Sequence, residues 1–207
     1  MNHNSSAVIG LSPFYKNTSV YQKSFGFNDY YLSDGNGGPP LGNVQLLGRV
    51  SGTILKANMP SVPEWLLEQV AARAIDFYAM SEDLPHPESR ILVDRDRIVM
   101  KWTRTNWQAH LDLVSKLKTA LKKAGFPLVL ARAFDKRTPS HQCGTVRIGN
   151  DPATAPLDIW CRAHDHPNLF VVDASYLPTS AAVNPALSVA AQALRVADHI
   201  QSRDLAA

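Results

Sequence analysis

Apolar and polar residues alternate between residues 90 and 102, on both sides of the Asp-Arg-Asp sequence at 94–96. Alternation on either side of a short polar turn predicts a β-hairpin. Other apolar runs are short and bounded by proline, glycine or polar residues, which is typical of strands. We expect three further strands or extended segments, at residues 7–11, 43–47 and 127–134.

A helix is predicted near the middle of the chain. Ser61 or Val62 is its expected cap, and Pro63 suits the first helical position because proline lacks the N–H that would be unpaired there. The apolar residues that follow extend this predicted helix to about Tyr78.

A second helix is predicted after Thr105. Thr105 and Gln108 have the spacing of a capping box, in which both side chains bind free N–H groups of the first turn. Residues 111–121 then carry apolar side chains three or four positions apart, and the helix is expected to end at Gly125.

The glycine-rich stretch at residues 34–40, Asp-Gly-Asn-Gly-Gly-Pro-Pro, is interpreted as a loop. It resembles a phosphate-binding loop only superficially, because a dinucleotide loop opens a helix whereas this stretch runs into two prolines. The aromatic residues between 21 and 32 suit an irregular or extended segment that lines a surface.

Together these elements predict an α+β fold with an antiparallel sheet and helices packed on it. The last third differs, with a loop, a short strand, a tight turn and one long helix from 186 to about 202. Small residues are frequent along this helix and allow close packing against a sheet or a cofactor. We therefore expect two parts, residues 1–139 and residues 140–207.

Composition and charge narrow the function classes. The chain has 207 residues, of which 45% are hydrophobic and 19% charged, and its net charge is +3, as in globular proteins. Four lysines between 116 and 123 fit a solvated helix face better than a nucleic-acid patch, so no nucleic-acid partner is predicted. No apolar run approaches the roughly 20 residues of a membrane span, so we expect a soluble protein. Nothing distinguishes a cytoplasmic from a periplasmic location.

The cysteines and a histidine pair give no metal prediction. Cys143 and Cys161 match neither a zinc nor a redox spacing, and a disulfide between them is open but unsupported. His164-Asp165-His166 invites a metal interpretation, but Pro167 follows and no third ligand is near in sequence, which favours a loop.

Three residues of the last third are candidates for chemistry. His141 lies in a polar loop outside any periodic pattern and is either a general base or a surface histidine. Asp173 closes the apolar run 169–172 and either faces a ligand crevice or bonds its own backbone in a turn. Asn184 precedes Pro185 at the start of the long helix, a position that suits an N-cap and whose free N–H groups can hold an anion.

Several motifs in this region resemble a known family. The sequences His-Gln-Cys-Gly-Thr-Val-Arg-Ile-Gly at 141–149, Asn-Leu-Phe-Val-Val-Asp-Ala-Ser at 168–175 and Asn-Pro-Ala-Leu at 184–187 are similar to the C-terminal signature of the glucose–methanol–choline (GMC) oxidoreductases. The resemblance covers roughly residues 83–203. Residues 82–91 and 106–110 resemble the family's substrate-domain hairpin and following helix, and residues 1–80 are a weaker match.

The resemblance implies an FAD-dependent oxidation of a CH–OH group. His141 matches the family's catalytic base, which removes the hydroxyl proton while hydride passes to the flavin, and Asn184 matches the position, held by His or Asn, that binds the substrate oxygen. Asp173 and Ala174 match positions that contact the FAD phosphates and ribityl chain. Asn184, Pro185 and Ala186 match the stretch beside the flavin ring, where a helix start stabilises negative charge.

The resemblance also implies a missing part. No G-x-G-x-x-G motif occurs in the 207 residues, and the family's dinucleotide-binding half is expected to be absent from this C-terminal portion. We expect residues 1–139 to be a partial substrate-binding domain and residues 140–207 to be the strand–helix part of the FAD-binding domain. The implied substrate is an alcohol, polyol or sugar. The alternative is a catalytically silent remnant, or a module that requires a separate FAD-binding chain.

Overall fold

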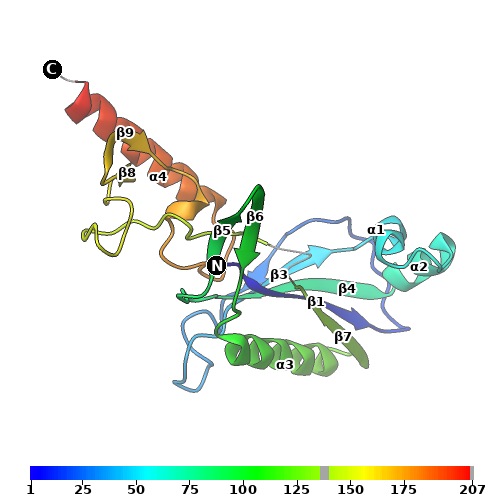
Figure 1. Ribbon diagram of the computed structural model, residues 1–207. Coiled ribbons are helices and arrows are strands. Elements are labelled where there is room, and N and C mark those ends of the chain that lie inside the picture. The colour runs from blue at the N-terminus through cyan, green and yellow to red at the C-terminus, as the bar shows by residue number, and fades with distance from the viewer. Residues whose placement is uncertain (136–139, 206–207) are drawn as a thin grey trace. The chain divides into compact units, whose positions relative to one another are not determined.

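The computed structural model describes residues 1–135 and 140–205 (Figure 1). The chain forms two compact units. The first, here called the sheet unit, contains residues 4–81 and 107–135. The second, here called the α4 unit, contains residues 1–3, 82–106 and 140–205.

A five-stranded antiparallel sheet forms the sheet unit, with the strand order β2-β3-β4-β1-β7. Its strands are β1 (Asn4–Leu11), β2 (Gly26–Phe27), β3 (Asn43–Gly48), β4 (Ala74–Ser81) and β7 (Leu128–Ala133). The register pairs Val8 of β1 with Phe77 of β4 and with Ala131 of β7. Because side chains alternate along a strand, this register places Val8 and Phe77 on one face, where both are buried.

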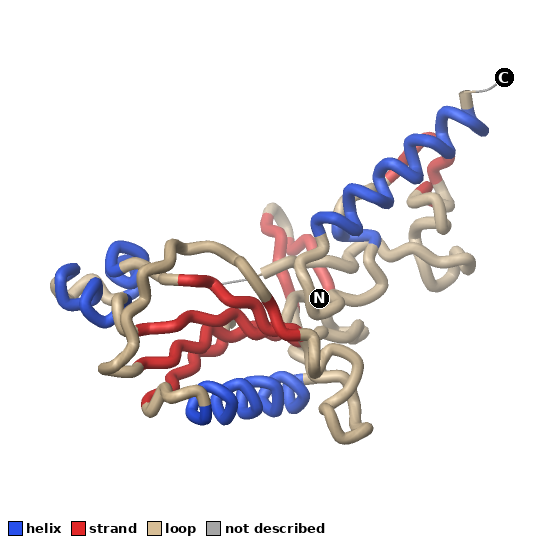
Figure 2. The backbone as a smooth tube through the Cα atoms, turned by 180° about the vertical axis from the view of Figure 1, so that it is seen from behind, coloured by secondary structure: helices blue, strands red, loops and turns tan. Residues whose placement is uncertain are grey.

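Helix α3 (Trp107–Lys123) covers that face of the sheet (Figure 2). Its buried side chains recur at helical spacing, with Leu113, Leu117 and Leu121 each at most 6% exposed. The helix ends where predicted, since Gly125 adopts φ +93°, a conformation that favours glycine. Two shorter helices of the same unit are α1 (Gly52–Asn58) and α2 (Glu64–Ala71).

Two helix predictions are wrong in detail. The chain leaves α2 at Ala71 and forms β4 from Ala74, so the predicted helix to Tyr78 ends early. The cap of α2 is Pro63 rather than Ser61 or Val62. The helix after Thr105 begins at Trp107, and the Thr105 hydroxyl donates to the Asp83 carboxylate; the capping box stays a prediction.

The α4 unit holds the remaining elements. The predicted hairpin is confirmed as β5 (Arg90–Asp94) and β6 (Arg97–Lys101), which are paired through the turn at Arg95. The other elements, in chain order, are β8 (Arg162–Ala163), β9 (His166–Phe170), the 3-10 helix η1 (Ala174–Tyr176), α4 (Ala186–His199) and the π-helical η2 (Ile200–Asp204). Buried Leu157, Cys161, Tyr176 and Val196 form the core of this unit.

The predicted α+β class with an antiparallel sheet and packed helices is confirmed. The two compact units do not follow a single boundary between residues 139 and 140, a point that lies outside the described residues. Residues 82–106 group with the C-terminal stretch because the chain leaves β4 at Ser81 and re-enters the sheet unit at Trp107. The assignment of substrate and cofactor roles to residues 1–139 and 140–207 stays a prediction.

Candidate active site

The side chains of His141 and Asn184 lie together in the α4 unit. The Nδ2 atom of Asn184 is 3.3 Å from Nε2 of His141. His141 is half-buried and Asn184 is exposed. An amide donor and an imidazole nitrogen are therefore held at one accessible point, which is the arrangement that a base and an oxygen-binding partner require.

A local backbone arrangement fixes the position of His141. The residue has φ +56°, a left-handed conformation that non-glycine residues rarely adopt. Backbone hydrogen bonds join the neighbouring residues to the start of the chain, from His3 N to Ser140 O at 3.2 Å and from Cys143 N to Met1 O at 3.2 Å. These contacts over-determine the strained turn, which is how such conformations persist at functional sites.

His3 lies directly behind His141. The two Nδ1 atoms are 3.0 Å apart, and the rings meet edge to face with centroids 4.8 Å apart. The other ring nitrogen of His3, Nε2, is 2.5 Å from the carbonyl oxygen of Ser180. His3 is 1% exposed, and this burial lowers its pKa from 6.5 to about 4. His3 is therefore neutral at pH 7.

Asp83 anchors the segments that carry His3 and Ser180. Its carboxylate, 1% exposed, accepts hydrogen bonds from Asn2 N at 3.0 Å and from Trp102 Nε1 at 2.9 Å. It also accepts from the N–H and the hydroxyl of Thr105. The N–H of Asp83 donates to the Ser180 hydroxyl oxygen at 2.7 Å. A buried carboxylate with this many donors holds its neighbours rigidly.

Helix α4 begins beside the pair. The residue at its N-cap position is Pro185, and no side chain caps the helix, so the prediction of Asn184 as N-cap is wrong. The Asn184 amide is directed to His141 instead. Pro185 is half-buried and Ala186 is exposed. An uncapped helix start of small residues carries partial positive charge and leaves room for a planar group.

Asp173 and Ala174 lie on a segment that is hydrogen-bonded to the stretch following His141. The Gly144 N–H donates to the Ala174 carbonyl at 3.3 Å, and the Val146 N–H to the Ser175 carbonyl at 3.0 Å. The exposed Asp173 carboxylate accepts from the Ser175 hydroxyl and from the Ser175 N–H. These bonds lower the pKa of Asp173, and the bond from the hydroxyl contributes more than the bond from the N–H. Asp173 is thus an ionised turn aspartate that faces solvent.

These residues fit the flavin that the sequence resemblance implies. The uncapped start of α4, at Pro185 and Ala186, suits the electron-rich edge of a flavin ring. The ionised Asp173 can accept hydrogen bonds from ribityl hydroxyls, whereas its charge opposes a phosphate. The fit is consistent with ring and ribityl contacts, and the predicted phosphate contact at Asp173 and Ala174 would have to come from the backbone rather than from the carboxylate.

Two cysteines and a further histidine of this unit are not candidates for the chemistry of the site. Cys143 and Cys161 are buried free thiols. Burial raises the pKa of Cys143 to about 11, so its thiol stays protonated at neutral pH and is a poor nucleophile. The Nε2 atom of His164 lies 3.3 Å from the Gly149 carbonyl oxygen, the geometry of a hydrogen bond to the backbone. Among residues 1–135 and 140–205, no three His, Cys, Asp or Glu side chains are grouped to hold a metal ion.

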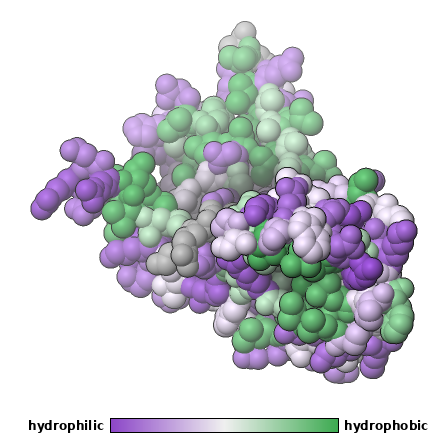
Figure 3. All heavy atoms as spheres, turned by 90° about the vertical axis from the view of Figure 1, so that its right-hand side faces the viewer, coloured by the Kyte–Doolittle hydropathy of each residue, from purple (hydrophilic) through white to green (hydrophobic). Residues whose placement is uncertain are grey.

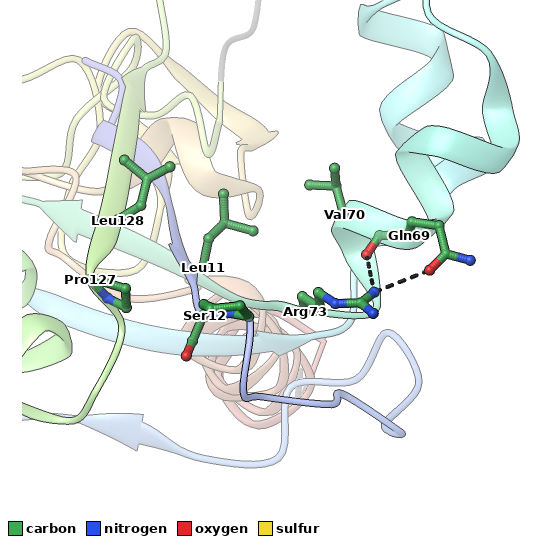
Figure 4. Close-up of a pocket in the computed structure, with 8 residues that line it drawn as sticks. Leu11, Ser12, Gln69, Val70, Arg73, Pro127 and Leu128 are labelled. Atoms are coloured by element: carbon green, nitrogen blue, oxygen red, sulfur yellow. Dashed lines mark hydrogen bonds between the residues drawn. The ribbon is translucent and has the colours of Figure 1, made fainter.

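A hollow of about 520 Å³ lies in the sheet unit, and none of the predicted site residues lines it (Figure 4). Most of its lining is apolar, and its one cationic group, Arg73, donates to the carbonyl and side-chain oxygens of Gln69. The lining residues are Leu11, Ser12, Pro13, Gln69, Val70, Arg73, Pro127 and Leu128. The hollow offers no base or nucleophile beside a convergent polar group, so it is not a candidate active site.

Large apolar side chains reach the surface in both units, and one face of the molecule shows apolar areas bordered by polar side chains (Figure 3). On α4, Leu187 is 82% exposed and Leu194 is 74% exposed. The described residues therefore leave one stripe of α4 uncovered. In the same described residues, no helix is long and apolar enough to cross a membrane.

Sequence reasoning missed His3, Asp83 and Ser180 as parts of the site. His3 is separated from His141 by 138 positions, and no periodic pattern or motif links the two. The one available signal is compositional, since residues 2–6 form a polar run directly before the apolar strand residues. A polar run buried at a strand start requires partners, but the sequence does not say which.

Comparison with known proteins locates these residues within a family pattern. A family model described as GMC oxidoreductase matches residues 85–193, which is more than half of the chain. The matched range includes His141, Asp173 and Asn184.

Individual proteins show the same likeness. A 2-methyl-1,2-propanediol dehydrogenase from Mycolicibacterium austroafricanum is 31% identical over 137 residues, covering 61% of this chain and 25% of that protein. The fructose dehydrogenase large subunit from Gluconobacter japonicus is 29% identical over 147 residues, covering 62% of this chain and 25% of that protein. The chain thus spans about a quarter of the length of these relatives.

A solved structure shares the fold. Pyridoxine 4-oxidase from Mesorbium loti superimposes with a TM-score of 0.57 at 20% sequence identity, covering 98% of this chain and 44% of that one. At this identity the match supports the fold alone. Nearly all of the chain finds a counterpart in that structure.

Proposed function

Because this chain belongs to the GMC oxidoreductase family, whose members are FAD-dependent, we propose that it carries the proton-accepting part of a flavin-dependent oxidation of CH–OH groups. The observation that carries the proposal is the 3.3 Å approach of Asn184 Nδ2 to His141 Nε2 on an accessible part of the α4 unit. The proposed catalytic residues are His141 and Asn184.

The two side chains have complementary roles toward an alcohol. A hydroxyl group that binds beside both atoms, in place of their contact with each other, donates its proton to Nε2 of His141 and accepts a hydrogen bond from Nδ2 of Asn184. As the proton moves to the imidazole, negative charge develops on the substrate oxygen, and the Asn184 amide stabilises that charge. General-base catalysis of this type contributes about 10²–10⁴-fold, and one oxyanion donor contributes about 10²–10³-fold.

FAD, when bound, would supply the acceptor for the hydride that leaves the carbon bearing the hydroxyl group. The residues of this chain that are proposed to contact it are Asn184, Pro185 and Ala186 at the start of α4, and Asp173 with Ala174 on the neighbouring segment. The helix start favours an electron-rich ring edge, and the Asp173 carboxylate favours hydroxyl groups. The adenine and pyrophosphate part of FAD would be held by residues that this chain does not supply, such as those of a separate FAD-binding chain.

The proposed substrate is an alcohol, polyol or sugar. The relatives compared above are named for a diol and for fructose, and a further relative, 27% identical over 160 residues, is a long-chain-alcohol oxidase from Arabidopsis thaliana. These names share a CH–OH group and little else, which supports the reaction class rather than a single substrate.

A titration of the purified chain with FAD tests the proposal. Binding is followed by quenching of flavin fluorescence, first with the chain alone and then with an FAD-binding half of a GMC protein added as a separate polypeptide. Reduction is followed by bleaching of the flavin absorbance under anaerobic conditions with a panel of alcohols, polyols and sugars. Bleaching that depends on this chain supports the proposal. A chain that neither binds flavin nor accelerates bleaching in either mixture is the silent remnant of the alternative hypothesis.

A further inference from the structure

The contacts of His3 determine where the proton of His141 resides. We propose that His3 is a positioning residue that holds His141 in the Nδ1–H tautomer, so that the Nε2 lone pair faces Asn184 and the substrate. This inference rests on the proposed function for its meaning, but it concerns a property of this chain that is measurable without flavin or substrate.

The first step follows from the Ser180 carbonyl. A carbonyl oxygen only accepts hydrogen bonds, so the nitrogen that faces it at 2.5 Å, Nε2 of His3, must carry a proton. The Ser180 segment is itself held by Asp83, whose N–H donates to the Ser180 hydroxyl oxygen at 2.7 Å. The position of the Ser180 carbonyl therefore determines that His3 Nε2 is the donor.

The second step follows from the charge of His3. A neutral imidazole carries one ring proton, and His3 is buried enough to remain neutral at pH 7, with its pKa lowered to about 4. Its single proton is on Nε2, so Nδ1 of His3 carries a lone pair. Two ionisable neighbours also act on the pKa of His3: His141 lowers it and Asp83 raises it.

The lone pair on Nδ1 of His3 determines which nitrogen of His141 is protonated. The Nδ1 atoms of the two rings are 3.0 Å apart, and a hydrogen bond at this distance needs one donor and one acceptor. His3 Nδ1 is the acceptor, so His141 Nδ1 is the donor. A neutral His141 then has its lone pair on Nε2, the nitrogen that faces the Asn184 amide at 3.3 Å.

The Ser140 hydroxyl is a weaker influence on the same nitrogen. Its Oγ atom lies 3.3 Å from His141 Nδ1, longer than the contact to His3. A hydroxyl both donates and accepts, so it can accommodate either tautomer of His141. His3 cannot, because its own proton is directed to a carbonyl.

The tautomer matters for the direction of proton transfer. A substrate proton can be accepted only by an unprotonated ring nitrogen that faces the substrate. The transferred proton binds Nε2 of His141, whereas the proton on Nδ1 stays in its hydrogen bond to His3. His3 neither gains nor loses a proton in this step, and it acts through His141 alone.

The test is a measurement of histidine tautomers by long-range ¹H–¹⁵N correlation on the ¹⁵N-labelled chain of 207 residues, above pH 7. His141 is assigned by the loss of its signals in His141→Ala. We expect a pyrrole-type shift for Nδ1 and a pyridine-type shift for Nε2 of His141, and the reverse for His3. A neutral His141 protonated at Nε2, or averaged between the two tautomers, would overturn the proposal.

Variants separate tautomer control from folding. His3→Leu removes the acceptor and should shift the His141 nitrogens toward a tautomer mixture, whereas His3→Asn supplies Oδ1 as an acceptor and should retain the wild-type pattern. His164→Leu is the matched control, since it removes another histidine of the same unit that is close to a backbone carbonyl, and it should change nothing at His141. An unchanged His141 pattern in folded His3→Leu contradicts the proposal. The wild-type spectrum decides the matter if His3→Leu does not fold.

Failure of the proposed function gives a different result. If the chain shows the expected tautomers but never promotes flavin bleaching, the positioning role of His3 stands and the oxidase or dehydrogenase role does not. If bleaching occurs but His141 carries its proton on Nε2, the function stands and the role of His3 is refuted.

Discussion

Asn184 and His141, 43 positions apart, meet with Nδ2 of the amide 3.3 Å from Nε2 of the imidazole. The contact shows which atom of each side chain is directed to the point where a substrate oxygen is proposed to bind. It also explains why α4 begins without a side-chain cap, because the asparagine that precedes Pro185 is directed to His141.

Replacement of Asn184 tests the oxygen-binding role. Asn184→Ala should lower the rate of flavin reduction, measured at saturating flavin, about 10²-fold or more, the usual loss for one oxyanion donor. Asn184→His should retain much of the rate, because an imidazole N–H can donate to the same oxygen. Stopped-flow absorbance of the flavin measures both, and equal rates for Asn184→Ala and wild type would rule out the assigned role.

Asp83 should be a main determinant of the stability of the α4 unit. Asp83→Ala leaves the donors of Asn2, Trp102 and Thr105 without their buried acceptor, and we expect a loss of about 3 kcal/mol or more in the free energy of unfolding. Urea unfolding followed by tryptophan fluorescence measures the loss. Asp96→Ala, at an exposed position of the hairpin turn, is the matched control and should change stability by under about 0.5 kcal/mol.

Asp76 should make the sheet unit less stable as pH rises. Burial raises the pKa of this carboxyl from 3.8 to about 6, partly offset by its hydrogen bond from Val50 N. Between about pH 4 and pH 6 the folded chain binds more protons here than the unfolded chain does, so stability falls as pH increases through this window.

The size of this effect can be measured by removing the charge. A pKa of about 6 instead of 3.8 for Asp76 corresponds to roughly 3 kcal/mol. Asp76→Asn, which keeps an oxygen for Val50 N–H, should therefore flatten the decline and stabilise the chain at pH 7. Urea midpoints at a series of pH values test this expectation. Asp112→Asn, at an exposed position of α3, should leave the pH profile as it is, and a wild-type decline that persists in Asp76→Asn would refute the assignment.

Gly42 should tolerate no side chain. It has φ +142°, and a Cβ atom there would lie 2.0 Å from the Met80 carbonyl oxygen. Gly125 is the matched control, because it also has a positive φ but has open space around its Cβ position. We expect Gly125→Ala to cost about 1 kcal/mol from backbone strain and Gly42→Ala about 3 kcal/mol or more. Thermal unfolding by circular dichroism compares them, and similar losses would show that the contact with Met80 is unimportant.

Local patterns in the sequence predicted the elements whose neighbours alternate or recur regularly. The hairpin of β5 and β6, strands β1 and β7, and the end of α3 at Gly125 all follow from such patterns. Strand β4 does not, because nearly all of its residues are buried and a continuous apolar run is not distinguishable from a helix by periodicity. Helix α1 was missed because it has only seven residues and begins at Gly52.

In the candidate site, too, some residues follow from local sequence patterns and others do not. The motifs in the sequence pointed to His141, Asp173 and Asn184, and the structure brings His141 and Asn184 together, whereas the roles of all three stay a proposal. His3 and Asp83 were not predicted, because their roles arise from hydrogen bonds between segments that are far apart in the chain. The atom-level direction of the Asn184 amide was also not predictable, since Asn before Pro suits an N-cap equally well.

The rate of flavin reduction in His141→Ala is the most direct measure of the role of His141 as the general base. The chain is combined with an FAD-binding half, the mixture is made anaerobic, and bleaching is recorded for wild type and variant with a substrate that wild type oxidises. We predict unchanged flavin binding and a reductive rate lowered about 10²–10⁴-fold, the contribution of a general base. Reduction by His141→Ala at the wild-type rate would contradict the assignment of His141 as the base.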